Sequence, residues 1–157
     1  MQIKKVYTVG NRDILGFPKI AFLCSRQIPA AAVLKCYDWA IEQREKEMCV
    51  ISGFQSQIEK DVLHYLLQGK QPVIIALARG LKERIEPELK DARSQNRLLI
   101  VTSFTAAAKR PSAETAVKRN RMMVEMANEG VFGYIKEGGA LAKLKSEYEG
   151  KKKMTLL

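Results

Sequence analysis

Six short apolar runs, separated by helical patterns, constrain the fold of this chain more than any other feature. The runs are apolar throughout instead of alternating with polar residues, which is typical of strands in a parallel sheet that helices cover on both faces. They occupy residues 5–9, 19–25, 48–52, 72–78, 97–103 and 131–135. This order predicts an α/β fold, a doubly wound, mostly parallel sheet with helices on both faces.

Helical spacing of apolar residues predicts five helices. The second shows a capping box, in which Ser56 is followed three residues later by Glu59, and Gly69 suits its end. The helices are expected at residues 29–46, 56–69, 81–94, from the stretch 116–130 to Asn128, and at 140–149. No internal repeat or linker interrupts the pattern, so we expect a single domain over residues 1–157.

The stretch "AVKRNRMMVEMANEG" at 116–130 places Lys118, Arg119 and Arg121 directly before an apolar helical pattern. Cations in the first turn of a helix oppose its dipole, so we interpret them as facing an anion. Alternatively the helix begins at Ser112, with Glu114 in its first turn, and the cations form an exposed basic face. The irregular stretch 104–115 before them is long enough for a functional loop.

The formal net charge of +10, from 27 Lys and Arg against 17 Asp and Glu, favours a polyanionic partner such as nucleic acid. Part of this excess lies in "GKKKM" near the C-terminus, which could be a solvated tail. No apolar run reaches the length of a membrane span, and the first residues do not resemble a secretion signal. The widely spaced Cys24, Cys36 and Cys49 predict reduced, buried thiols in the cytoplasm instead of a metal site.

Small and cationic residues follow several of the strands. These turns are Ser25-Arg26, Ser52-Gly53-Phe54, Arg79-Gly80 and Gly138-Gly139. In open parallel sheets ligands bind at the carboxyl ends of the strands, where backbone amides and helix N-termini attract anions. Strand-to-helix turns also need Gly or Ser for their own geometry, so each turn alone is a weak signal.

Catalytic patterns are absent from the sequence. His64 is the single histidine and lies in a helical pattern, and neither a GxSxG elbow nor a GxxxxGK[ST] phosphate loop occurs. The carboxylates Glu59, Asp61, Glu114 and Glu125 have helical-surface interpretations. We therefore expect a non-enzymatic protein without a cofactor or a bound metal.

Residues 5–145 resemble the Rossmann-like core of the DNA-processing protein A (DprA/Smf) family. The resemblance rests on four segments, "VYTVGNRDILGFPKIAFLCSR", "VISGFQSQIEKDVLHYLLQGKQPVIIALARGL", "KRNRMM" and "EGGALAKL". They are similar to the family's Gly-Ser-Arg turn, SGxARG turn, Arg-Asn-Arg segment and SGxL turn. Cys24 replaces a glycine of the first turn, and Gln55-Ser56-Gln57 replaces the small-Arg-Gly run of the second. We expect the core without the helical and winged-helix extensions that often flank it in this family.

The resemblance implies binding of single-stranded DNA without catalysis and a recombinase as partner protein. It also implies a phosphate-binding rim, and the strand exits described above supply residues to that rim. The expected residues are Ser25, Arg26, Ser52, Gly53, Lys118, Arg119, Asn120, Arg121, Gly138 and Gly139. Within this set we expect Arg119 and Arg121 to supply much of the affinity, with Arg26 on the opposite wall.

A small-molecule nucleotide binder, or a phosphoribohydrolase similar to the cytokinin-activating LOG enzymes, is the alternative function. That activity resembles one that needs a GGxGTxxE turn, whereas this chain has Gly138-Gly139-Ala140-Leu141 and no glutamate at the matching place. The family resemblance further implies a homodimer. The sequence itself offers only two hints of it. Trp39 lies off the main apolar helical face, where an interface is one interpretation and the core is the one we favour, and "MTLL" ends the chain, either as an added strand or against a partner.

Overall fold

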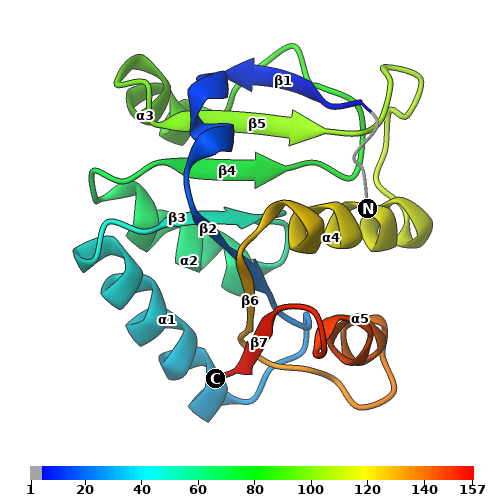
Figure 1. Ribbon diagram of the computed structural model, residues 1–157. Coiled ribbons are helices and arrows are strands. Elements are labelled where there is room, and N and C mark those ends of the chain that lie inside the picture. The colour runs from blue at the N-terminus through cyan, green and yellow to red at the C-terminus, as the bar shows by residue number, and fades with distance from the viewer. Residues whose placement is uncertain (1–4) are drawn as a thin grey trace.

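The computed structural model describes residues 5–157 as a seven-stranded sheet between two layers of helices (Figure 1). The strands are β1 Tyr7–Gly10, β2 Lys19–Leu23, β3 Cys49–Ser52, β4 Val73–Ala76, β5 Leu98–Thr102, β6 Glu129–Phe132 and β7 Lys153–Leu156. The helices are α1 Ala30–Glu45, α2 Gln57–Leu67, α3 Lys90–Ser94, α4 Ala113–Met126 and α5 Ala140–Tyr148, with short 3-10 helices η1 Arg12–Gly16 and η2 Pro87–Leu89. The predicted doubly wound α/β fold is confirmed.

The strand order is β1-β5-β4-β3-β2-β6-β7, and every pair is parallel except the edge pair β1–β5. The six apolar runs of the sequence correspond to β1–β6, with ends shifted by a few residues. Met154, Thr155 and Leu156 of the C-terminal "MTLL" belong to β7, which pairs with β6 and adds a seventh strand. Of the two alternatives for this segment, the added strand is therefore correct.

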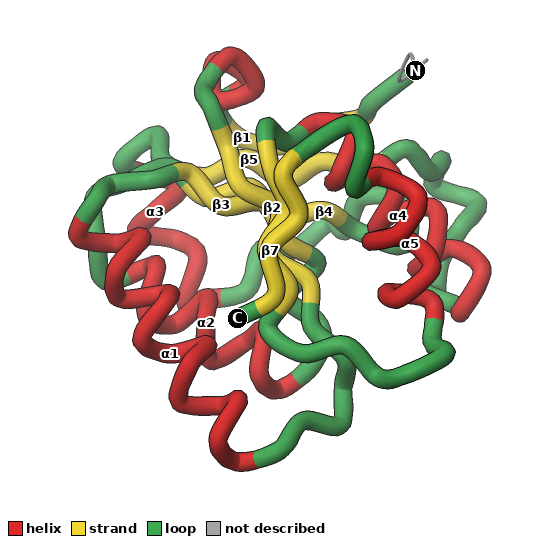
Figure 2. The backbone as a smooth tube through the Cα atoms, turned by 60° about the horizontal axis from the view of Figure 1, so that its bottom comes forward, coloured by secondary structure: helices red, strands yellow, loops and turns green. Residues whose placement is uncertain are grey.

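The two faces of the sheet are covered by different helices. Alternate strand residues pack either against α1, α2 and α3 or against η1, α4 and α5. Figure 2 shows α1, α2 and α3 on one side of the strands and α4 and α5 on the other. On the first face, Trp39 is 7% exposed and stacks on Phe22 with ring centroids 5.0 Å apart. Trp39 is therefore a core residue and lends no support to the homodimer, which stays a prediction.

Two helix predictions need correction. Residues 81–86 are not helical, because Pro87 lacks the N–H of a helix interior and disfavours helical backbone before it. Only η2 and α3 form in the stretch 81–94. Helix α4 begins at Ala113 and not at the cationic stretch, which confirms the alternative start at Ser112 with Glu114 in the first turn. Ser112 caps the helix by accepting a hydrogen bond from the Thr115 backbone N–H at 3.1 Å.

Local signals elsewhere match the structure. The capping box of α2 is present, with Ser56 accepting from the Glu59 N–H and Glu59 accepting from the Ser56 N–H. Cys24, Cys36 and Cys49 are free and buried, as their spacing predicted. Across residues 5–157, no helix has both the length and the apolar character that crossing a membrane would require.

Candidate functional site

A cleft of about 760 Å³ opens at the carboxyl ends of the central strands. Strands β2 and β6 are neighbours, but the chain leaves β2 toward α1 on one face and leaves β6 toward α5 on the other. Loops that diverge in this way leave a crevice between them, the usual ligand position in open α/β sheets. The cleft also takes in the exits of β3 and β4, through Gln55 and Ala78.

Three helix N-termini meet at this cleft. The capping residues of α2, α4 and α5, which are Ser56, Ser112 and Gly139, all line it. The first turn of each helix carries backbone N–H groups without intrahelical partners and a partial positive charge. Three such ends around one hollow make a strongly anion-attracting environment.

Arg119 lines this cleft and is only 6% exposed. Its Nε donates to Asn120 Oδ1 at 2.8 Å, and Nη1 donates to the Ala76 carbonyl at 3.4 Å. Within residues 5–157 Arg119 forms no ion pair. A buried, unpaired guanidinium is costly, so this residue type at this place points to an anionic ligand.

Burial lowers the pKa of Arg119, because desolvation disfavours the charged form, and nearby Arg26 lowers it further. Glu59 acts in the opposite direction. One carboxylate oxygen of Glu59 accepts from the Gln55 and Ser56 backbone N–H groups, each at 3.1 Å. Glu59 is therefore engaged in capping α2, and it offsets the positive charge of Arg119 only by electrostatic attraction at a distance.

Gly53 makes room for the guanidinium. A Cβ at this position would lie 2.2 Å from Arg119 Nη1 and 2.5 Å from its Cζ, far inside any real contact. Just before it, Ser52 is fully buried, and its Oγ accepts from the Phe54 backbone N–H at 3.3 Å. The Ser52-Gly53 turn thus lies against the Arg119 guanidinium, although neither Ser52 nor Gly53 lines the cleft.

The exits of β2 and β6 supply two further cations, Arg26 and Lys136, both exposed at the cleft. Ser25 joins these exits, since its N–H donates to the Tyr134 carbonyl at 2.9 Å and its Oγ accepts from the Lys136 N–H at 2.8 Å. Arg26, Arg119 and Lys136 outnumber the single carboxylate, Glu59, among the lining residues. The cleft therefore has a net positive charge.

Five of the predicted binding residues line the cleft together. They are Ser25, Arg26, Arg119, Asn120 and Gly139. Gly138 lies in the turn before α5 with φ +74°, where an added Cβ would meet nothing within 4 Å, so its role is backbone conformation.

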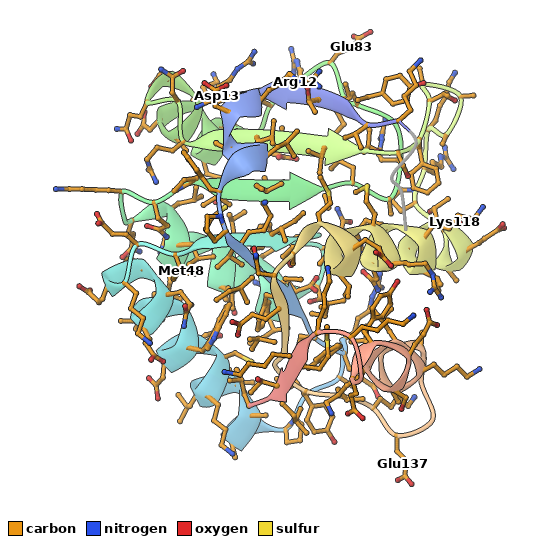
Figure 3. All side chains as sticks on the ribbon, in the orientation of Figure 1. Arg12, Asp13, Met48, Glu83, Lys118 and Glu137 are labelled. Atoms are coloured by element: carbon orange, nitrogen blue, oxygen red, sulfur yellow. The ribbon has the colours of Figure 1, made fainter. Side chains whose placement is uncertain are left out.

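Lys118 and Arg121 do not line the cleft, and the expectation that the whole KRNR segment faces it is wrong. Because α4 begins at Ala113, these residues lie beyond its first turn. Lys118 is one position and Arg121 two positions from Arg119, and residues so spaced on a helix do not face the same way. Lys118 projects from the outer side of α4, 3.4 Å from Glu114 (Figure 3). Arg121 pairs with Glu147 of α5, with Nη2 3.1 Å from Oε1, and this pairing raises its pKa.

Sequence reasoning did not identify Ser112 or Lys136 as residues of this site, although both line the cleft. The signal for Ser112 was available, since Ser112 and Thr115 form a capping box that marks the true start of α4. Lys136 carries no such signal, because only the pairing of β2 with β6 brings it beside Ser25.

Solved structures share this architecture. DNA processing protein A (DprA) from Streptococcus pneumoniae matches with a TM-score of 0.76 and 21% identity, covering 96% of this chain and 54% of that protein. A Helicobacter pylori structure, described as giving insights into the single-stranded DNA binding mode of DNA processing protein A, matches with a TM-score of 0.76 and 19% identity, covering 98% and 71%. The chain thus spans about half the length of the first relative.

The molybdenum cofactor binding protein from Rippkaea orientalis is similar in fold, with a TM-score of 0.61 and 13% identity over 88% of this chain and 75% of that one. A comparison with curated proteins gives no match. The family model described as DNA recombination-mediator protein A matches residues 2–156, nearly the full length. The chain therefore belongs to the DNA recombination-mediator protein A family.

Proposed function

We propose that this protein binds single-stranded DNA without catalysis, holding the phosphates in the cleft at the strand ends. The observation that carries the proposal is Arg119, a buried guanidinium without an ion pair among residues 5–157, placed where three helix N-termini meet. Membership of a family of DNA recombination mediators supports the same ligand. So does the Helicobacter pylori relative, which is described as binding single-stranded DNA.

The lining of the cleft favours phosphates over bases as the groups recognised there. None of the residues that line it is aromatic, so it lacks the stacking platforms that hold bases. Recognition through phosphates carries no direct sequence information, so we expect little sequence preference. A duplex should bind more weakly, because its persistence length of about 150 base pairs prevents it from bending into the cleft.

We expect the residues that line the cleft to catalyse no reaction. Glu59 is its one carboxylate and is held by the α2 cap. Cys24 is its one thiol, and contact with Cys36 together with burial raises the pKa of Cys24 far above its ordinary range. The neutral thiol is a poor nucleophile. Incubation with nucleoside monophosphates should release no free base, and turnover that depends on Glu59 would favour the phosphoribohydrolase instead.

Salt dependence tests the binding proposal directly. Each phosphate contact on a single strand contributes a log–log slope of about −0.7, so the three cations of the cleft predict a slope near −2 for oligo-dT. Fluorescence anisotropy at a series of salt concentrations measures it. An affinity that does not change with salt, or no binding at low salt, would contradict the proposal.

The supporting turn gives a second prediction. Gly53→Ala should weaken oligo-dT binding by about tenfold, because the new Cβ would overlap the Arg119 guanidinium and displace it from one charge-assisted phosphate contact. Gly16→Ala is the matched control, since a Cβ there meets nothing within 4 Å. Equal affinities of the two variants in the anisotropy titration would show that the position of Arg119 does not matter.

A further inference from the structure

The cleft contains backbone donors that the fold itself leaves free. Helix α4 begins at Ala113 and α5 begins at Ala140, so the N–H groups of Ala113, Ala140 and Leu141 have no acceptor within their own helices. Within residues 5–157 none of these three groups donates a hydrogen bond, and all three residues line the cleft. The N-termini of α4 and α5 therefore offer free donors to a ligand in the cleft.

The N-terminus of α2 reaches the same cleft but is already engaged. Glu59 accepts from the backbone N–H groups of Gln55 and Ser56, so a carboxylate of the protein itself occupies this helix end. The first helical residue of α2, Gln57, does not line the cleft. Among the three helix ends, the free donors of the lining thus come from α4 and α5.

Arg119 adds a free donor from a side chain that is only 6% exposed. Its Nε and Nη1 donate to Asn120 and to the Ala76 carbonyl, whereas Nη2 donates to no group among residues 5–157. A Cβ at Gly53 would lie closest to Nη1, Cζ and Nε, so Nη2 is the part of the guanidinium that lies farther from this turn. A buried guanidinium with a free donor indicates a ligand independently of the helix ends.

The charge of the lining also exceeds what one internal phosphate of a strand can neutralise. The three cations Arg26, Arg119 and Lys136 against the one carboxylate of Glu59 leave two positive charges. A phosphodiester inside a strand has one negative charge and two free oxygens. A phosphate monoester at the end of a strand has close to two negative charges at neutral pH and three acceptor oxygens.

We infer that the cleft takes the terminal phosphate monoester of a single strand. Its three oxygens accept from the N-terminus of α4, from the N-terminus of α5 and from Arg119 Nη2. This inference rests on the proposed function and adds to it a preference for a phosphorylated strand end. A strand with hydroxyl ends still binds through its diesters, but it leaves one of these donors without an acceptor and one positive charge without a partner.

The test compares oligo-dT strands that differ only at their ends and carry the fluorophore on an internal base. A strand with a 5′-phosphate or a 3′-phosphate should bind about tenfold more tightly than one with two hydroxyl ends, the scale of one added charge-assisted hydrogen bond. The end that gives the gain identifies the direction in which the strand enters. Methyl esterification of that phosphate should abolish the gain, because it removes one charge and one free oxygen.

Proline variants test the backbone donors one at a time. Proline at the first position of a helix suits the helical backbone and lacks only the N–H. Ala113→Pro and Ala140→Pro should therefore each reduce the gain from a terminal phosphate to less than about threefold. Gln57→Pro is the matched control, because it makes the same change at the start of α2, outside the lining, and should keep the full gain.

The outcomes separate the two proposals. Binding of no strand at low salt refutes the proposed function, whereas equal affinities for phosphorylated and hydroxyl-ended strands leave it standing and overturn the end preference. A hydroxyl-ended strand two nucleotides longer has the same charge as the phosphorylated one, so an equal gain from it also overturns the inference. So does a gain that Gln57→Pro reduces as much as Ala113→Pro and Ala140→Pro. The comparison of strands uses the wild-type protein and decides the inference even if a proline variant fails to fold.

Discussion

Arg119→Met should reduce the affinity for oligo-dT by about 10- to 100-fold. A charge-assisted hydrogen bond contributes about 1.5–3 kcal/mol, and each 1.4 kcal/mol is a factor of ten in the dissociation constant. The melting temperature should not fall, because the substitution removes a buried charge without an ion-pair partner among residues 5–157 and keeps an apolar side chain of similar length. Anisotropy titration and thermal unfolding measure the two effects on the same sample.

Arg121→Met is the matched control on the same helix. Arg121 pairs with Glu147 outside the cleft, so its loss should change affinity by less than about twofold at physiological salt, where charges more than ~8 Å apart are largely screened. The contrast separates a specific phosphate contact from the general effect of net charge. Equal losses in the two variants would show that the protein attracts DNA only through its overall charge.

Lys152→Ala should lower the free energy of unfolding by about 2–3 kcal/mol, roughly the loss of a cation that holds several carbonyl groups. Its Nζ donates to the carbonyls of Val124 and Ala127 at 2.7 Å and to that of Glu125 at 2.9 Å. These carbonyls belong to the last turn of α4 and to its C-cap, Ala127, where the helix leaves carbonyls without partners and has the negative end of its dipole. Urea unfolding monitored by circular dichroism gives the value.

Lys151→Ala shares the charge change but not the contacts. Lys151 is exposed, and its Nζ lies 5.5 Å from the centre of the Tyr148 ring, so its removal should cost no more than about 0.5 kcal/mol. If Lys152→Ala is equally mild, the three carbonyl contacts contribute nothing to stability. The interpretation of this lysine run as a solvated tail is thus corrected for Lys152, which belongs to the folded domain.

The sheet could be predicted from the sequence because its central strands are buried on both faces and so carry uninterrupted apolar runs. The α2 boundary could be predicted because Ser56 and Glu59 satisfy backbone groups within one turn. Contacts between distant parts of the chain could not be predicted. The structure confirms Trp39 as a core residue, but its partner Phe22 of β2 could not be named, because nothing in the helical periodicity of α1 indicates it.

The candidate site was predictable in its position and only partly in its residues. Strand exits could be located from the sequence, and Ser25, Arg26 and Gly139 follow from them. Which cation of α4 enters the cleft depends on the angle around the helix, and hence on a start at Ser112 that the apolar pattern alone did not reveal. A smaller hollow, which Leu81 and Ile85 help to line, depends on segment 81–86 being non-helical, so a predicted helix there concealed it.

The place of β2 in the sheet has a consequence for how the protein is made. Its neighbours are β3, which follows closely in the chain, and β6, which emerges late; Lys19 exchanges hydrogen bonds with Asn128, 109 residues away. Contacts of such long range slow folding, and an unpaired strand edge promotes aggregation until it is covered. During synthesis, therefore, the edge of β2 that pairs with β6 stays unpaired until β6 has been made. Because Lys136 and the start of α5 come later still, the cleft is incomplete until both have been synthesised.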